Sequence, residues 1–207
     1  MIKRISKWLA AAALFLPLAA HASILQFNAS LSAANEIPPA PNSFIAGAAG
    51  AATLFYDTVT NTYTFSLFAF GLSTATSGTV TGAHIHAQAS TSQNGPVRIF
   101  LDTAPFTFLT PQNSPLMLPG TLSIGGGNVA APVALIPAGN GNLAQSFLAV
   151  LQAGNAYVNV HTTTNGSGEI RGQLFQVAIV PELESYAMML AGMGLLGFIA
   201  RRRRTQA

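Results

Sequence analysis

Short segments of the chain alternate between apolar and polar residues, and this two-residue period is typical of half-buried β-strands. The segments are rich in Val, Ile, Phe, Tyr and Thr, and Gly, Pro and Asn separate them, which favours strands over helices. Polar residues between the two strongest candidates, 52–57 and 63–70, predict a hairpin. The predicted strands cover residues 24–31, 52–57, 63–70, 80–88, 97–102, 157–162 and 169–177.

One segment follows a helical period instead. Its apolar residues lie at positions i, i+4, i+7 and i+8, as Leu143, Phe147, Val150 and Leu151. Gly154 follows at a position where helices commonly end. We therefore expect one short helix at this place.

Two regions predict irregular structure. Residues 35–42 are rich in proline and are expected to form a loop. Residues 103–127 contain four prolines and three consecutive glycines, and we expect no more than a weak strand there, near residues 121–124.

The composition indicates a folded domain and excludes several kinds of site. Half of the residues are apolar and 7% are charged, whereas disordered chains are poorer in apolar residues and richer in charge. The absence of cysteine excludes disulfides, thiolate metal sites and cysteine nucleophiles. A length of 207 residues suits one domain with targeting segments.

The basic pI of about 9.7 arises from the two ends of the chain. Seven of the nine basic residues lie there, as Lys3, Arg4, Lys7, Arg201, Arg202, Arg203 and Arg204. Between residues 23 and 180, two arginines face four acidic residues, which gives a net charge of −2. A nucleic-acid-binding module needs basic side chains on its folded face. The sequence therefore predicts no nucleic-acid partner.

The N-terminal end has the parts of a secretory signal peptide in their usual order. Three basic residues precede an apolar run over residues 8–20, and small residues stand at both positions that determine cleavage. We therefore predict that residues 1–22 direct export by Sec-type machinery. Cleavage is expected between Ala22 and Ser23.

The C-terminal end predicts attachment to the inner membrane. Pro181 and Glu182 precede an apolar run over residues 186–200, and the arginines 201–204 follow it. Fifteen helical residues reach about 22 Å, and long arginine side chains with bilayer thinning can cover the rest of a hydrocarbon core of about 30 Å. The arginines are expected to stay in the cytoplasm, with the domain outside.

This end resembles the PEP-CTERM sorting signal of Gram-negative bacteria, which combines a short Pro-Glu-Pro motif, a membrane segment rich in Gly and Leu, and an arginine cluster. Residues 178–207 have these parts in the same order. The resemblance implies recognition and cleavage by an exosortase-like enzyme, in systems that produce an exopolysaccharide matrix. Leu183 stands in place of the second motif proline, which favours a retained anchor over cleavage.

Three predicted strands combine an apolar face with a polar face, because side chains alternate sides along a strand. The polar faces carry His84 and His86 on the first strand, Tyr157, Asn159 and His161 on the second, and Glu169, Arg171 and Gln173 on the third. If these strands are neighbours, the polar residues form one cluster. The register stays open, because a shift by one residue would move a strand's whole set to the other face.

These strands resemble the CHRD (chordin-type) domain family, whose pattern contains Gly-Ala-His-Ile-His, Tyr-Val-Asn-Val-His-Thr and Gly-Glu-Ile-Arg-Gly-Gln. Here they are residues 82–86, 157–162 and 168–173, and residues 27–38 are similar to the opening strand and loop of the family. The resemblance places a CHRD-like domain at residues 23–177. It implies an all-β fold, an immunoglobulin-like sandwich or a Greek-key barrel, with one short helix and with a signal peptide and a C-terminal transmembrane helix on either side.

Two kinds of site fit the polar cluster. His84, His86 and His161 could bind copper or zinc, because neutral imidazole suits both ions. The alternative is a hydrogen-bonded network in which Arg171 pairs with Glu169 and the histidines bond to backbone or to polar neighbours. A copper–zinc superoxide dismutase site is excluded, because it needs more histidines than the three that follow the signal peptide.

The sequence therefore predicts an exported, non-enzymatic binding or structural module of the cell surface or extracellular matrix. Exopolysaccharide is a candidate partner, and no cofactor is certain. The alternative function is a periplasmic or surface protein that binds copper or zinc through the three histidines.

Overall fold

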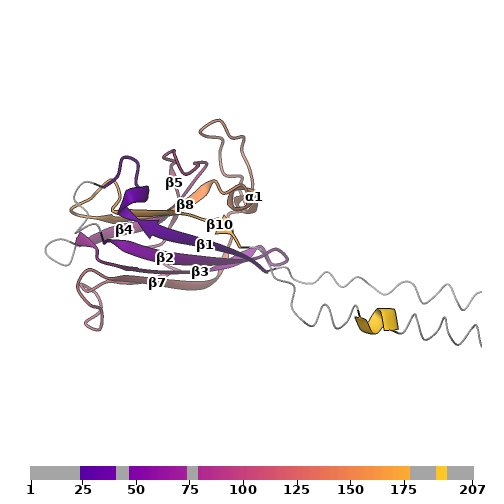
Figure 1. Cartoon of the computed structure of the whole chain (residues 1–207), viewed down its shortest axis with the longest axis horizontal. Coiled ribbons are helices and arrows are strands. Elements are labelled where there is room, and N and C mark those ends of the chain that lie inside the picture. The colour runs from indigo at the N-terminus through magenta and orange to yellow at the C-terminus, as the bar shows by residue number, and fades with distance from the viewer. Residues whose placement is uncertain (1–23, 41–46, 74–78, 178–189, 195–207) are drawn as a thin grey trace, which may run out of the picture.

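The computed structural model describes residues 24–40, 47–73, 79–177 and 190–194 (Figure 1). Its strands form one antiparallel sheet in the order β5-β4-β8-β9-β1-β2-β3-β7-β6, and β10 pairs with β1. The strands are β1 (Ile24–Ser32), β2 (Ala49–Asp57), β3 (Thr62–Phe70), β4 (Val80–Ala87), β5 (Val97–Phe100), β6 (Thr107–Leu109), β7 (Leu122–Ala130), β8 (Ala156–Thr162), β9 (Ile170–Gln173) and β10 (Phe175–Gln176). A short 3-10 helix, η2 (Ala33–Asn35), follows β1.

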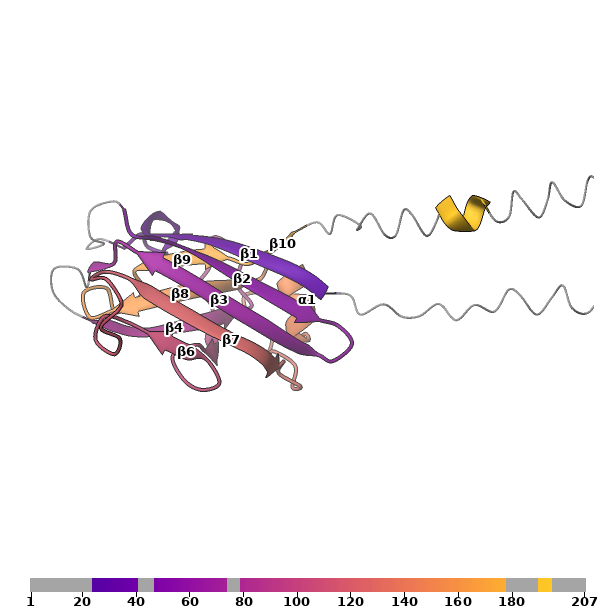
Figure 2. The ribbon, with the colours of Figure 1, turned by 90° about the horizontal axis from the view of Figure 1, so that it is seen from below.

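The sheet curls into two layers around the hydrophobic core (Figure 2). One layer contains β1, β2, β3 and β7, and the other contains β4, β8 and β9. Inward side chains of both layers are buried, among them Phe27, Leu54 and Phe65 from the first and Ile85 and Val158 from the second. Each such side chain contributes about 1.5–3 kcal/mol on burial. The all-β class predicted from the two-residue period is confirmed in this two-layered form.

β2 and β3 form the predicted hairpin, with nine residue pairs in register. Asp57 begins the turn, and its Oδ1 accepts hydrogen bonds from the main-chain N–H groups of Val59 and Thr60 at 2.8 and 3.1 Å. Asn61 completes it with a φ of 54°, a conformation that asparagine tolerates well. Local side-chain bonds therefore support the pairing that the apolar alternation specifies.

Most of residues 103–121 form turns and bends, and a strand begins at Leu122, as predicted for this region, but the short strand β6 and the continuation of β7 through the glycines were not predicted. β7 continues through the three glycines and pairs with β3. A Cβ on Gly126 would lie 2.5 Å from Cδ1 of Phe106, whose ring also packs edge-on against Phe65 with centroids 6.2 Å apart. The missing side chain at Gly126 thus leaves room for an aromatic ring that covers the strand.

The predicted helix is α1 (Phe147–Gln152), and it begins later than the apolar spacing indicated. Ser146 caps it, because its Oγ accepts a hydrogen bond from the N–H of Ala149 at 3.2 Å. Leu143 lies before the helix and is 80% exposed, so its helical spacing has no structural meaning. Gly154 has a φ of 66°, the left-handed conformation that commonly ends a helix.

The last predicted strand, residues 169–177, is divided into β9 and β10. β9 pairs with β8 and, at Arg171 and Ser32, with β1, and β10 pairs with β1 further along that strand. Leu174 lies between β9 and β10, is buried, and donates its N–H to the carbonyl of Ala156 at 2.9 Å.

Most of the predicted end segments lie outside the described residues. These predictions are the signal peptide over residues 1–22, its cleavage between Ala22 and Ser23, the motif residues Pro181 and Glu182, and the arginine cluster 201–204. Residues 190–194, inside the predicted membrane segment 186–200, are helical. Within the described ranges, no helix has the length and apolar character to cross a membrane.

Replacement of Gly126 by alanine should destabilise the domain, because the new methyl group displaces the buried ring of Phe106. We expect G126A to lower the free energy of unfolding by about 1–3 kcal/mol, the usual cost of overpacking. Gly125 is the matched control, since a Cβ there meets no atom within 4 Å and G125A should be slightly stabilising. Urea denaturation measures both variants, and a G126A chain as stable as wild type would contradict this packing.

Candidate functional site

The outer face of β4, β8 and β9 carries the polar residues that the sequence assigned to three strands. The pairs between β4 and β8 are Gly82 with His161, His84 with Asn159, and His86 with Tyr157. The pairs between β8 and β9 include Tyr157 with Gln173 and Asn159 with Arg171. The register that the sequence left open therefore places these polar side chains on one side of the sheet, with the core on the other.

Three histidines of this face form a compact cluster. The ring centroids of His84 and His161 are 4.9 Å apart, and that of His86 lies 5.9 and 6.1 Å from them. One ring nitrogen of each residue lies within 4.8 Å of those of the other two. The ring of His86 stacks on Tyr157 with centroids 4.7 Å apart. The structure thus brings together the three histidines singled out in the sequence.

Main-chain carbonyls set the tautomers of two of these histidines. Nδ1 of His86 lies 2.8 Å from the oxygen of Gly95, and Nδ1 of His161 lies 3.1 Å from that of Gly166. Because a carbonyl only accepts, Nδ1 carries the proton and Nε2 keeps its lone pair. Both Nε2 atoms and Nδ1 of His84 are buried and have no hydrogen-bond partner among the described residues. Metal-bound histidines commonly have this arrangement, in which the other ring nitrogen donates to a carbonyl.

The cluster has the protonation state that a metal ion requires. Burial lowers the pKa of all three histidines, and it brings the pKa of His86 to about 4. The neighbouring His161 lowers the pKa of His84 further, while the charge of Asp102 opposes this effect. All three rings are therefore neutral at pH 7 and have lone pairs that can bind a metal.

Asp102 is a neighbour of the cluster that the sequence analysis did not select. A Cβ added to Gly82 would lie 3.0 Å from Oδ2 of Asp102 and 3.2 Å from Nε2 of His84, so both side chains lie beside this glycine. Oδ1 of Asp102 is buried without a hydrogen-bond partner in the part of the chain that the structure describes. Asp102 reaches this position through the pairing of β4 with β5, where Leu101 donates its N–H to Ala83 at 2.9 Å. No local pattern could have indicated it.

The spacing of the three nitrogens fits a metal ion after a small movement. Ligands of a tetrahedral zinc ion lie about 3.4 Å apart, because each Zn–N bond is about 2.1 Å long. Nitrogens up to 4.8 Å apart would approach one another by on the order of 1 Å, which small ring rotations can provide. The residues present therefore fit copper or zinc, with the carboxylate of Asp102 beside them.

Arg171 lies on the same face and is 1% exposed. Its Nη2 donates to the carbonyls of Ser90 and Gln93 at 2.9 and 2.7 Å, and its Nη1 donates to Oδ1 of Asn94 at 2.9 Å. The guanidinium carbon lies 3.5 Å from the centroid of the Tyr157 ring. A buried cation needs such partners, and Arg171 takes most of them from the loop between β4 and β5.

The predicted pairing of Arg171 with Glu169 is wrong, because the carboxylate of Glu169 bonds elsewhere. It is fully buried and accepts hydrogen bonds from the main-chain N–H and the hydroxyl of Ser73 and from the hydroxyl of Thr162, each at 2.6 Å. Glu169 precedes β9, whereas Arg171 lies within it. Glu169 therefore anchors neighbouring loops and does not contribute to the histidine cluster.

Glu36 is the carboxylate that interacts with Arg171, and the sequence analysis did not assign it to the site. It follows η2, is 6% exposed, and accepts a hydrogen bond from Nδ2 of Asn159 at 3.4 Å. Burial raises its pKa to about 7, although the charge of Arg171 acts in the opposite direction. A Cβ added to Gly168 would lie only 2.7 Å from Oε1 of Glu36 and 2.7 Å from Oδ1 of Asn159. Only glycine therefore fits at position 168.

Replacement of Glu36 by glutamine should remove a pH-dependent loss of stability. The folded-state pKa of about 7 exceeds the ordinary value of 4.5, so the folded domain binds more protons than the unfolded chain between these values. Wild type therefore loses stability from this group as the pH rises from about 4.5 to 7, and E36Q does not. We expect E36Q to match wild type near pH 5 and to exceed it at pH 8 by on the order of 1–3 kcal/mol in urea unfolding.

Asp57 provides the control for this pH dependence. Main-chain hydrogen bonds from Thr60 and Val59 lower its pKa, so ionised Asp57 stabilises the folded state above its unfolded pKa. Because this change in stability is complete below about pH 5, D57N should differ from wild type by a constant amount between pH 5 and pH 8, whereas the difference for E36Q should grow. A difference between E36Q and wild type that stays constant from pH 5 to pH 8 would contradict the raised pKa of Glu36.

Comparison with known proteins identifies the family of this domain. The CHRD domain family model matches residues 27–174, a range that includes the histidine cluster, Glu36 and Arg171. No match was found among curated proteins or among solved structures. Because the match covers well over half of the sequence, the chain belongs to the CHRD domain family.

Proposed function

We propose that this chain is an exported, non-enzymatic module of the cell surface or extracellular matrix that binds one copper or zinc ion through His84, His86 and His161. The observation that carries the proposal is the convergence of three neutral imidazoles from β4 and β8, of which His86 is buried and His84 and His161 are half-buried. The CHRD family suggests an extracellular or secreted β-domain protein, which supports the extracellular part.

The donor atoms favour copper or zinc over other common ions. Calcium and magnesium prefer oxygen ligands, whereas imidazole nitrogen suits copper and zinc. The carbonyl bonds at Nδ1 of His86 and His161 hold the two rings with Nε2 free, so little rearrangement accompanies binding. The negative charge of Asp102 would partly offset the charge of the ion.

The surroundings of the histidines support binding more than catalysis. A catalytic metal keeps one position open for water or substrate. Here the ring of Phe100 packs edge-on against His84 with centroids 5.1 Å apart, His86 is 7% exposed, and the carboxylate of Asp102 lies near the ring of His84. These neighbours restrict access to an ion at this place.

The two ends of the sequence support export and sorting. The N-terminal segment has the features that Sec-type machinery handles, and Pro181 and Glu182 belong to the segment that an exosortase-like enzyme would recognise. We propose that the domain is first held at the inner membrane by residues 186–200, on the outer side, and then reaches the cell surface or the exopolysaccharide matrix. Leu183 favours slow removal of the anchor.

The full chain, stripped of metal, should bind one Zn(II) ion per molecule in calorimetric titration. Removal of one ligand in H86A should weaken binding at least about 100-fold. Because the pKa of His86 is about 4, protons compete only weakly for this ring between pH 7 and about pH 5.5.

T81A is the matched control for this titration, because Thr81 is an exposed residue of the same strand, β4. It should bind zinc like wild type. Substoichiometric zinc in wild type, or equal affinity in wild type and H86A, would refute the metal site.

Export and sorting can be tested on the protein in its native envelope. Intact-mass analysis should give a chain that begins at Ser23, because the signal peptide is removed. Replacement of the arginines 201–204 by glutamine should reduce the surface-exposed fraction after cell fractionation, since these charges set the orientation of the membrane segment. Full-length, unprocessed chain in the cytosol would contradict the proposed route.

A further inference from the structure

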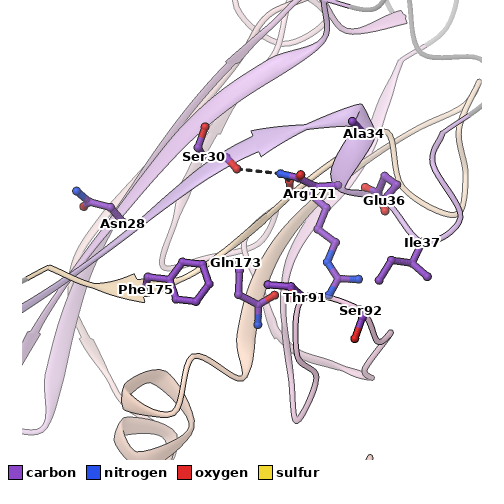
Figure 3. Close-up of a pocket in the computed structure, with 11 residues that line it drawn as sticks. Asn28, Ser30, Ala34, Glu36, Ile37, Thr91, Ser92, Arg171, Gln173 and Phe175 are labelled. Atoms are coloured by element: carbon purple, nitrogen blue, oxygen red, sulfur yellow. Dashed lines mark hydrogen bonds between the residues drawn. The ribbon is translucent and has the colours of Figure 1, made fainter.

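A pocket of about 550 Å³ lies beside Arg171, and neither the histidine cluster nor the predicted function accounts for it (Figure 3). Its walls come from β1, the segment around η2, the loop between β4 and β5, and β9 with β10. The volume falls within the range of about 300–1,000 Å³ that is usual for small-molecule sites. The pocket is therefore large enough to hold a specific ligand.

The pocket is lined mainly by neutral side chains that form hydrogen bonds. These are Asn28, Ser30, Asn35, Thr91, Ser92 and Gln173, of which Asn35 and Gln173 already use their amide nitrogens on main-chain carbonyls. Amide and hydroxyl groups both donate and accept hydrogen bonds. Such a lining matches a ligand with many hydroxyl groups, which also donate and accept.

The two charged residues of the lining do not present their charge to a ligand. Arg171 is 1% exposed and uses three N–H bonds on the loop between β4 and β5. Glu36 is 6% exposed and bonds to Asn159. An anionic or cationic ligand would therefore lose hydration without gaining a direct ionic partner. The pocket selects for a neutral ligand.

Phe175 provides an apolar surface at one end of the pocket (Figure 3). One edge of the Phe175 ring packs on Gly154, because a Cβ added to this glycine would lie 3.2 Å from Cε1 of Phe175. Phe175 nevertheless remains 54% exposed. Asn28 lies opposite Phe175 in the pairing of β1 with β10, so an amide flanks the ring. A pyranose ring has the matching features, namely an apolar C–H face for an aromatic ring and hydroxyls at its edge for amides.

The pocket is formed before any ligand binds. Arg171 fixes the loop between β4 and β5, and Nδ2 of Asn94 in this loop donates to the carbonyl of Ile37 at 2.7 Å, which ties it to the segment after η2. Two walls of the pocket are thus linked to each other. A rigid site loses less conformational entropy on binding.

We propose that this pocket binds a neutral hexopyranose unit of a polysaccharide, with Phe175 against the face of the sugar ring and the surrounding amides and hydroxyls bonded to its hydroxyls. The site is separate from the histidine cluster and rests on the proposed extracellular location, where polysaccharides are found. It gives the module a carbohydrate partner whether or not the histidines bind metal.

Calorimetric titration of the full chain with neutral tetrasaccharides tests the proposal. The probes are tetrasaccharides of glucose, galactose, mannose and N-acetylglucosamine, with a tetrasaccharide of glucuronic acid for comparison. At least one neutral probe should bind in a 1:1 ratio with a Kd below about 1 mM, and more tightly than the uronic acid probe. F175A should weaken this binding at least about tenfold, and F175W should retain it.

F68A is the matched control, because Phe68 lies on β3 and is 52% exposed, close to the exposure of Phe175. F68A should bind the saccharide like wild type, and thermal unfolding should show that all variants are folded. Failure of every neutral probe, or unchanged affinity in F175A, would overturn the proposal. The zinc titration is independent of each of these results.

Discussion

The burial of the Arg171 guanidinium is the constraint on which the polar face of this domain depends. A buried cation needs hydrogen-bond partners, and Arg171 obtains them from two carbonyls and from Asn94 in the loop of residues 90–95. These bonds hold the loop over β8 and β9. The same loop contains Gly95, whose carbonyl sets the tautomer of His86, and it also forms one wall of the pocket. Arg171 therefore fixes a loop that contributes both to the histidine cluster and to the pocket.

Main-chain carbonyl dipoles stabilise the buried charge of Arg171 together with the carboxylate of Glu36. Glu36 interacts with Arg171, but burial raises the pKa of Glu36 to about 7, so the carboxylate is only partly ionised at neutral pH. Carbonyl oxygens and the ring of Tyr157 supply further stabilisation. Two fully ionised buried groups would each lose hydration, and their attraction often fails to repay that cost. The arrangement limits this loss while it keeps the loop in place.

The two-residue period predicted most of the strands and the residues that share a face, because alternation is a local property of a strand. It could not predict Glu36, which reaches the polar face through contacts between segments far apart in the sequence, or Asp102, whose position depends on the register of β5 against β4. The three consecutive glycines were wrongly predicted to be irregular, because glycine occurs in loops and also in strands where an aromatic ring covers the backbone. The expected partner of Arg171 was wrong because Ser73 and Thr162 bind the carboxylate of Glu169, and the contact with Ser73 joins segments far apart in the sequence.

The short strand β9 shows why a domain without cysteine uses buried polar groups to define its fold. β9 has four residues, which is too few for apolar alternation alone to fix its register. Gly172 faces the backbone of Ser30, where a Cβ would lie 2.6 Å from the carbonyl oxygen, so a slip of one residue would force a side chain into that backbone. The same slip would separate Arg171 and Glu169 from their partners and leave two buried charges uncompensated. The residues that specify the register of this strand are thus also those that hold the functional face in position.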